Sequence, residues 1–390
     1  MIRHRSLLSL LLALGVSLGL SLGACAAEVV VSDVTSRAVP IHIAGFSGDA
    51  KTVLEFDLYV AGFDLVAPDK AQYSLNGKSG GALEGVLADV NNKATLFNRS
   101  YPGGSARAQA HALADDVVQA ITGRKGISRT KLVFKVQKDR VSEVYASDFD
   151  GANPVQLTAD GNIIAAPAWR PGRKSIVYTS YRAGNADIYS QDLTTGARKT
   201  LVRFSGSNIS PAPSPDGSKL AMILSRAGSP DLWVGDSEGG NPRRLTTTAA
   251  DESSPCWSPD GSTLCVVSRE SGFPQLYTIL AGGGAMRRLT TAGVRTTTEP
   301  DWSPDGKWIA FTRSRGDYFD ICIVPATGGD AKVITEGEDP SWAPNSRTLV
   351  FARRTSKFGP RKLSLLDWPT GHVKDIAQVA GSSSQPSWSR

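Results

Sequence analysis

Residues 130–390 alternate short apolar strands with polar turns in units of nearly constant length. Each unit opens with Pro-x-Trp or a variant of it, turns at Ser-Pro-Asp-Gly or a variant of that, and continues with an apolar strand. Proline can open a strand without removing a needed ladder donor, and Pro, Asp and Gly supply the geometry of tight turns. The opening prolines lie 40 to 46 residues apart: Pro167, Pro211, Pro255, Pro300, Pro340 and Pro386.

Each unit contains four short strands, the last two of which are represented by Asp231-Leu-Trp233 and Arg243-Arg-Leu-Thr246. A sheet of this size cannot cover its own apolar faces, so we expect the units to pack around a ring as a β-propeller. Residues 131–158 supply three strands without an opening strand, and residues 385–390 supply an opening strand with nothing after it. The two ends complete a sixth blade. We therefore predict a mainly β protein, with a six-bladed propeller over residues 130–390 that is closed by its C-terminal strand.

Residues 28–127 have a different pattern and are predicted to form a small α/β domain. Residues 50–61 and 105–121 have the apolar spacing of helices, and Gly123 is a typical stop for the second helix. Short strands are expected at residues 29–31, 41–43 and 63–66, and a hairpin at residues 83–89 and 94–101. Residues 68–81 are predicted to be a polar loop.

Residues 1–27 are predicted to be a secretory signal peptide. Arg3 and Arg5 form a positive region, residues 7–22 form an apolar region, and small residues follow. Cleavage after residue 26 or 27 would release a soluble exported product. Leu22-Gly-Ala-Cys25 also matches a lipobox, which would make Cys25 a lipid anchor. We favour the soluble product and keep the lipid anchor as the alternative.

Composition and charge exclude several classes of protein. With 39 Gly, 21% charged and 41% hydrophobic residues, the chain is neither a disordered protein nor a helical bundle. Its formal net charge of +6 comes without a Lys/Arg run interleaved with aromatic residues, so we expect no nucleic-acid partner. A single long apolar run excludes a multi-span membrane protein. The four His are scattered, so we expect no metal and no cofactor.

Catalytic patterns in the sequence are weak, and we expect no enzymatic activity. Gly77-Lys-Ser-Gly-Gly81 matches G-x-S-x-G, but the expected loop lacks the strand and the helix of a nucleophile elbow. Asp216, Asp260 and Asp305 are separated by whole blades, so we interpret them as turn residues and not as a carboxylate site.

Export would permit disulfides. Pairing Trp257 with Leu264 places Cys256 directly opposite Cys265, within reach of a bridge if the pair is non-hydrogen-bonded. The alternative, which we prefer, is two small buried side chains in a sheet, with Cys322 buried elsewhere.

The stretches directly before the opening prolines lead into the innermost strands, so they are expected to ring one mouth of the channel. This ring is small, polar and partly acidic, which suits an extended peptide held by hydrogen bonds. The alternative is that these stretches are ordinary solvated loops. They are Ala165-Ala166, Asn208-Ile-Ser210, Asp251-Glu-Ser-Ser254, Thr297-Thr-Glu299, Glu338-Asp339 and Ser384-Gln385.

These features together resemble the TolB family, the periplasmic propeller components of the Tol–Pal cell-envelope system. The resemblance rests on the repeats, on the closing Pro386-Ser-Trp388, and on the junction Ile121-Thr-Gly-Arg-Lys-Gly-Ile127. It implies a non-enzymatic adaptor, expected to be a monomer, that supports outer-membrane integrity and cell division. Its channel mouth would accept a segment of a Pal-like lipoprotein, or of colicin-like peptides that mimic it. The positions implied are Asn208, Ser210, Ser253, Ser254, Thr298 and Glu299.

The resemblance also implies that the mature N-terminal strand contacts a TolA-like inner-membrane protein through Glu28, Val29, Val30 and Val31. The α/β domain is shorter than is usual in that family, so a different partner stays open. The rival classes are a propeller enzyme and a carbohydrate-binding module of the cell envelope. The first would need a hydrolase domain or clustered ligands at the channel, and the second exposed aromatic residues at its mouth; the sequence has neither pattern.

Overall fold

The structure is a computed structural model that describes residues 36–354, 356 and 359–389. The described residues belong to one compact unit. The predicted signal peptide, Cys25 and the predicted Glu28–Val31 strand lie outside them. No helix in the described part of the chain is long and apolar enough to span a bilayer.

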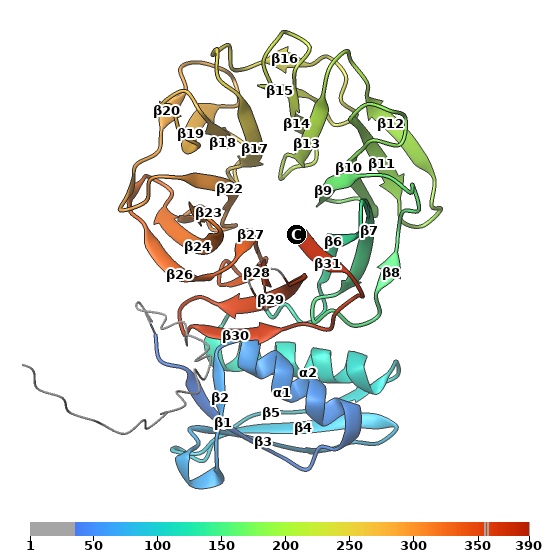
Figure 1. Cartoon of the computed structure of the whole chain (residues 1–390). Helices are drawn as coiled ribbons and strands as arrows, with labels where there is room; N and C mark the ends of the chain where they lie inside the picture. Colours follow the sequence, from blue (N-terminus) through green and yellow to red (C-terminus); the bar gives the residue numbers. More distant parts are fainter. Residues whose placement is uncertain (1–35, 355, 357–358, 390) are drawn as a thin grey trace, which may run out of the picture. The chain divides into compact units, whose positions relative to one another are not determined.

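Six four-stranded antiparallel sheets are arranged in a ring (Figure 1). The first blade joins the two ends of the propeller sequence, because β31 (Ser382–Trp388) pairs with β6 (Lys131–Lys138) and is followed by β7 (Val141–Asp148) and β8 (Val155–Gln156). Trp388 lies opposite Leu132 in this ladder. The predicted six-bladed propeller, closed by the C-terminal strand, is therefore confirmed.

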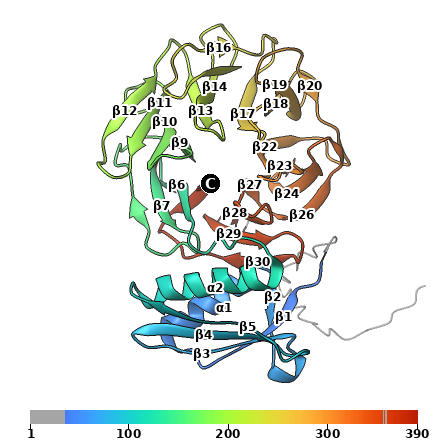
Figure 2. The ribbon, with the colours of Figure 1, turned by 180° about the vertical axis from the view of Figure 1, so that it is seen from behind.

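The five other blades follow in chain order, each from its inner to its outer strand (Figure 2). The second and third blades are β9 (Ile164–Trp169), β10 (Ser175–Ser180), β11 (Asp187–Asp192), β12 (Arg198–Val202), and β13 (Asn208–Pro213), β14 (Lys219–Leu224), β15 (Asp231–Asp236), β16 (Arg243–Arg244). The fourth and fifth are β17 (Glu252–Trp257), β18 (Thr263–Ser268), β19 (Gln275–Leu280), β20 (Arg287–Arg288), and β22 (Thr297–Trp302), β23 (Trp308–Arg315), β24 (Tyr318–Pro325), β26 (Lys332–Glu336). The sixth is β27 (Glu338–Trp342), β28 (Thr348–Arg354), β29 (Arg361–Asp367), β30 (His372–Asp375), and a small ladder joins β21 (Thr291–Ala292) to β25 (Gly329–Asp330).

The turns between the first two strands of the third, fourth and fifth blades are held by their own side chains. In the third blade, Asp216 Oδ1 accepts hydrogen bonds from Ser214 Oγ at 2.5 Å and from the Ser218 amide at 3.0 Å. These hydrogen bonds, that from Ser214 first, lower the pKa of Asp216 to about 2. Asp216 is thus bound within its own turn, which supports its interpretation as a turn residue.

The N-terminal part is a five-stranded sheet of order β2-β1-β3-β4-β5 with two helices on one face. Its elements are β1 (Val39–Ala44), α1 (Gly48–Val60), β2 (Phe63–Leu65), the 3-10 turn η1 (Pro68–Lys70), β3 (Tyr73–Lys78), β4 (Ala82–Asp89), β5 (Thr95–Pro102) and α2 (Ala106–Thr122). Ser105 caps α2 by accepting from the Ala108 amide at 3.2 Å, and Gly123 ends it with a φ of 69°. The predicted helices are present.

The predicted polar loop at residues 68–81 is wrong, because β3 is the central strand of this sheet. It pairs in parallel with β1 and antiparallel with β4. Only Leu75 of this strand is buried against the helices, so the apolar alternation was too sparse to reveal it. The strand runs through Ser79 into β4 as a hairpin. Ser79 therefore still lacks the following helix that a nucleophile elbow requires.

The helices pack directly against the propeller. Val60 of α1 belongs to the same buried cluster as Phe134, Leu365 and Trp388. Gly62, which follows α1 with a φ of 91°, lies so close to the sixth blade that a Cβ atom would be 2.6 Å from Arg347 Nη2. This continuous core explains why the described residues form one unit.

Cys256 and Cys265 oppose each other in the pairing of β17 with β18, as expected, but no disulfide joins them: Cys265 is a free, buried cysteine. The Ser258 amide donates to the Thr263 carbonyl at 2.9 Å, so by alternation the cysteine pair is also hydrogen-bonded, with Cα atoms about 5.5 Å apart. The closer, non-hydrogen-bonded arrangement assumed for the bridge is not the one formed. The preferred alternative, two side chains packed in a core cluster, fits the structure.

Candidate functional site

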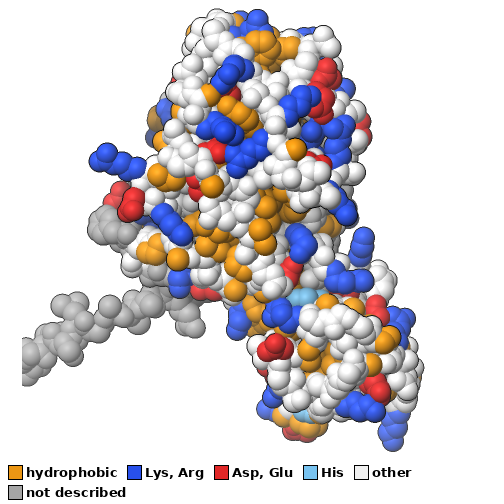
Figure 3. All heavy atoms as spheres, turned by 90° about the vertical axis from the view of Figure 1, so that its right-hand side faces the viewer, with side chains coloured by type: hydrophobic (Ala, Val, Ile, Leu, Met, Phe, Trp, Pro, Cys, Tyr) orange, Lys and Arg blue, Asp and Glu red, His pale blue; other side chains and the backbone are white. Residues whose placement is uncertain are grey.

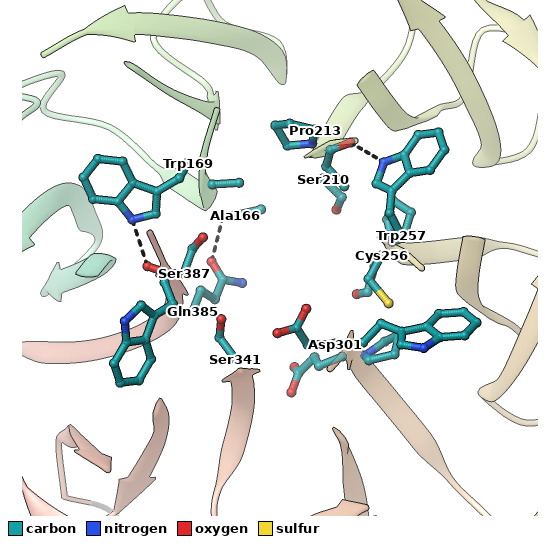
Figure 4. Close-up of a pocket in the computed structure, with 18 of the residues that line it drawn as sticks. Ala166, Trp169, Ser210, Pro213, Cys256, Trp257, Asp301, Ser341, Gln385 and Ser387 are labelled. Carbon is teal, nitrogen blue, oxygen red and sulfur yellow. Dashed lines mark hydrogen bonds between the residues drawn. The ribbon is translucent and has the colours of Figure 1, made fainter. Parts of the chain in front are cut away.

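A channel of about 500 Å³ runs through the propeller and is lined by the innermost strands of all six blades (Figure 4). The opening prolines and the residues on either side of them make up its wall. The described histidines, His42, His111 and His372, are not among the lining residues. The channel wall therefore contains no His-based metal centre.

The residue before each opening proline has a left-handed backbone, with φ between 49° and 57°. The strand pairing shifts register at the same place in all six innermost strands, so each of these residues forms a β-bulge. A left-handed residue other than Gly costs about 1–3 kcal/mol, so each must be held in place by its surroundings. We call these six residues the bulge ring: Ala166, Ser210, Ser254, Glu299, Asp339 and Gln385, all of which line the channel.

One arc of the bulge ring is a relay of side chains that bind the backbone of the next blade. Glu299 Oε2 accepts from the Asp339 amide at 3.0 Å, and Asp339 Oδ2 accepts from the Gln385 amide at 2.9 Å. Gln385 Oε1 then accepts from the Ala166 amide at 2.9 Å. Each side chain thus fixes the bulge of its neighbour, and the arc is rigid and acidic.

Asp339 is the strongly perturbed acid of this arc. Burial, together with the nearby negative charges of Glu299 and Glu338, raises the pKa of Asp339 well above its usual value, against the opposing effect of Lys135. Burial in turn lowers the pKa of Lys135, although the neighbouring acids oppose this. The channel mouth therefore holds acidic and basic groups that are incompletely solvated.

The other arc, formed by Ala166, Ser210 and Ser254, has small side chains. The Ser210 amide donates to Thr179 Oγ1 at 3.1 Å, so the backbone of this arc is held by the blade before it. Figure 4 shows the Ser210 side chain directed into the channel. The bulge ring therefore combines a filled acidic arc with an open arc that offers hydroxyl groups.

Three of the five repeated tryptophans connect neighbouring blades around the same channel. The indole Nε1 of Trp169 donates to the Ser387 carbonyl at 3.1 Å, and that of Trp257 donates to the Ala212 carbonyl at 2.8 Å (Figure 4). Trp342 makes the equivalent bond to the Asp301 carbonyl at 3.1 Å. The motif that reveals the repeat thus also fixes the blades to one another.

The structure divides the six channel positions implied by the resemblance into two groups. Ser210, Ser254 and Glu299 line the channel, whereas Asn208, Ser253 and Thr298 are not among its lining residues. Asn208 is fully buried, and its side chain binds the carbonyls of Phe204, at 2.9 Å, and of Ala186, at 3.2 Å. Asn208 therefore closes a loop within the fold.

The other three members of the bulge ring line the channel just as Ser210, Ser254 and Glu299 do. They are Ala166, Asp339 and Gln385. Their signal in the sequence is their position directly before an opening proline. They were present in the predicted mouth stretches but were not singled out, because only the comparison of all six bulges shows that this one position is the shared one.

Outside the channel, charges of both signs are mixed on the outer face of the second and third blades (Figure 3). Arg173 and Lys199 both contact Glu238, at 2.9 Å and 2.8 Å, and Arg198 pairs with Asp160. The two exposed pairs of Glu238 contribute about 0–1 kcal/mol each and describe a solvated surface, whereas Asp160 is buried in its pair with Arg198.

Comparison with known proteins agrees with this architecture. Residues 118–390 match the family described as PD40, TolB beta propeller domain. The chain is 29% identical to the Tol-Pal system protein TolB of Legionella pneumophila (strain Corby) over 216 residues, which are 47% of this chain and 52% of that protein. It is 31% identical to the Tol-Pal system protein TolB of Polaromonas naphthalenivorans over 214 residues, 46% of this chain and 50% of that protein. The aligned segment thus spans about half the length of these curated relatives.

The same fold occurs in a solved structure, the crystal structure of TolB from Acinetobacter baumannii. The two structures superpose with a TM-score of 0.82 at 24% identity, over 92% of this chain and 98% of that chain. This likeness shows the fold, including the small α/β part, and the family match covers most of the chain. The chain therefore belongs to the TolB beta-propeller family.

Proposed function

We propose that this protein is a non-enzymatic periplasmic adaptor of the Tol–Pal system, and that its bulge ring binds an extended segment of a Pal-like lipoprotein. The system is suggested by the names of the relatives, Tol-Pal system protein TolB. The observation that carries the binding site is the bulge ring, in which six strained residues are held at one level of the channel. Strain that recurs at one place in every blade is typical of a functional site.

The two arcs of the ring would contribute differently to binding. The hydroxyls of Ser210 and Ser254 can donate to and accept from a peptide backbone in the open arc. The carboxylates of Glu299 and Asp339 can accept hydrogen bonds from amide or cationic groups of the ligand. Because the relay already fixes this arc, little ordering is needed when the ligand enters, which favours affinity.

The test is calorimetric titration with the purified soluble domain of a Pal-like lipoprotein. Ser210→Trp would fill the open arc, and Glu299→Lys would break the bond to the Asp339 amide and reverse a charge. Each is expected to weaken binding at least about tenfold, equal to about 1.4 kcal/mol. Thr194→Trp, an exposed position outside the channel, is the matched control and should bind like the wild type. Thermal melting of each variant separates lost binding from lost folding. Wild-type affinity in both folded channel variants would withdraw the site.

We also propose that Glu28, Val29, Val30 and Val31 contact a TolA-like inner-membrane protein after removal of the signal peptide. A strand that can dock or come free would let one ligand shift the affinity for the other by its differential binding. Deleting residues 28–31 should abolish TolA binding and leave the Pal-like affinity within about threefold, equal to about 0.7 kcal/mol. Colicin-like peptides would compete for the bulge ring, and cells with the channel variants should show leaky outer membranes and delayed division.

A further inference from the structure

A group of charged side chains is buried between the helices and the first blade, away from the channel. Asp57 comes from α1, His111 and Arg107 come from α2, and Asp150 follows β7. Asp57, His111 and Asp150 are 1%, 6% and 8% exposed. Charged side chains are seldom buried so completely unless they compensate one another.

His111 lies between two carboxylates, one on each side of its ring. Nδ1 is 2.7 Å from Asp57 Oδ2, and Nε2 is 3.9 Å from Asp150 Oδ2. Asp150 is also ion-paired with Arg107. Within the described residues, His111 Nε2 and Asp57 Oδ1 are buried without a hydrogen-bond partner.

While both carboxylates are ionised, the charges in this group balance in only one protonation state of the imidazole. Two carboxylates face one guanidinium, so the group is neutral when His111 carries a proton on both nitrogens. The imidazolium can then donate from Nδ1 to Asp57 and attract Asp150 electrostatically across 3.9 Å, whereas a neutral ring offers neither buried carboxylate a compensating charge. Charge balance therefore favours the protonated form.

The other charged groups around His111 change this balance little. Asp115, one turn along α2, accepts from the Ser128 amide at 2.8 Å and from Arg129 Nε at 2.9 Å. Burial opposes the shift, but Lys131 and, to a smaller extent, the charge of His111 lower the pKa of Asp148, which is ion-paired with Lys131 at 2.6 Å. The remaining neighbour, Phe149, presents its ring edge-on at 5.6 Å.

The direction of the pKa shifts agrees with the charge balance. Burial opposes a charged imidazole, but the hydrogen bond and the negative charge of Asp57, with help from Asp150, outweigh it and raise the pKa of His111. Burial raises the pKa of Asp57 to about 6, against the lowering effect of His111. Both groups thus hold protons more tightly in the folded protein than in the unfolded chain.

A second histidine, on the propeller side, also contacts the α/β part. His372 on β30 stacks on Tyr59 of α1 with ring centroids 4.2 Å apart, and its Nδ1 is 2.9 Å from the Tyr59 carbonyl. Its Nε2 is 3.1 Å from Asp64 of β2. A histidine and a carboxylate therefore face each other between the α/β part and the propeller in two places.

A metal ion fits the buried group poorly. Single ligand atoms of Asp57, His111 and Asp150 lie within 4.8 Å of one another. The carboxylates, however, flank opposite nitrogens of the ring, and Arg107 already neutralises Asp150. A proton on His111 instead supplies a positive charge between the two carboxylates without any added ligand.

We propose that His111 is a proton-dependent clamp between the α/β part and the propeller: its charged ring ties Asp57 to Asp150, and loss of the proton loosens the helices from the first blade. The clamp is complete above the pKa of Asp57, about 6, where that carboxylate is ionised, and it is lost as the pH rises through the raised pKa of His111. It requires no partner, so it stands independently of the proposed channel function.

The first test is an NMR titration of the imidazole signals in the whole protein. His111 is expected to titrate above its ordinary pKa of about 6.5, and Asp150→Asn should lower that value by about one unit or more. A wild-type His111 that titrates at or below the ordinary value would overturn the proposal, and this result needs no variant to fold.

The second test is hydrogen exchange with mass spectrometry, corrected for the intrinsic dependence of exchange on pH. Between pH 6 and pH 8.5, peptides from α1, α2 and residues 149–152 should lose at least about fivefold in protection, while peptides from β17 and β18 should not. His42→Gln is the matched control and should keep this behaviour, because among the described residues the hydrogen bond of the His42 ring is made with the Val66 carbonyl, at 3.0 Å. His111→Gln should show low protection of the helices at both pH values. Equal protection of the wild-type helices at both pH values would refute the clamp.

Discussion

Removing the indole of Trp388 should destabilise the whole propeller, because this side chain fastens the C-terminal strand to the start of the ring. Trp388 is 2% exposed, it packs in the cluster that contains Leu132 and Phe134, and its Nε1 donates to Thr130 Oγ1 at 2.6 Å. Truncation of a buried Trp to Ala costs about 3–5 kcal/mol. That is a large part of the roughly 5–15 kcal/mol that stabilises a typical protein.

Urea denaturation followed by fluorescence and by circular dichroism measures this loss. With an m-value of about 3 kcal/mol per molar, Trp388→Ala should lower the midpoint by about 1 M or more. Trp388→Phe keeps most of the apolar contact and should lose about 1 kcal/mol, the value of one hydrogen bond. Trp308→Ala, at a half-buried position in the fifth blade, is the control and should cost less than Trp388→Ala. If Trp388→Ala cost no more than this control, the C-terminal strand would not be the fastening of the ring.

Two further predictions concern backbone geometry and thiol reactivity. Gly62→Ala should destabilise the protein by at least about 1 kcal/mol more than Gly184→Ala in urea melts. Both glycines have a φ above 90°, but only the new Cβ atom at position 62 would meet Arg347 and Asp367. Equal losses of stability would contradict the close approach. Cys322 is fully buried, and burial raises its pKa to about 12. At pH 8 a thiol reagent should therefore modify Cys322 only after the protein unfolds. Rapid modification of Cys322 in the native protein, located by peptide mapping, would contradict its burial.

The repeat made the propeller predictable from the sequence, whereas the site needed the structure. Pro-x-Trp and the turn residues act within a few positions of each other, so their spacing alone fixed the blades and the closure at Trp388. Strand β3 was missed because only Leu75 faces the helices, and its place in the sheet depends on partners distant in sequence. Asn208 was expected at the channel because it lies near an opening proline. Its amide instead binds Phe204 and Ala186, which no local pattern indicates.

The contacts in the bulge ring and in the buried group at His111 also depend on residues that are distant in the sequence. Each bulge can be located in the sequence as the residue before an opening proline, but the relay from Glu299 to Asp339 and Gln385 joins three blades. The buried group joins residues as distant as Asp57 and Asp150. Charges that meet only after folding carry no local signature, so such contacts could not be predicted.

The pairing of β31 with β6 has a consequence for how the chain reaches its final form. The first blade cannot be completed until β31 has been made, because β31 is its innermost strand and follows the five other blades in the sequence. Until then, the edge of β6 that β31 covers is unpaired, and such edges invite intermolecular pairing. The period between synthesis and closure is therefore when this protein is most exposed to aggregation, and a chaperone that shields β6 would act at that stage.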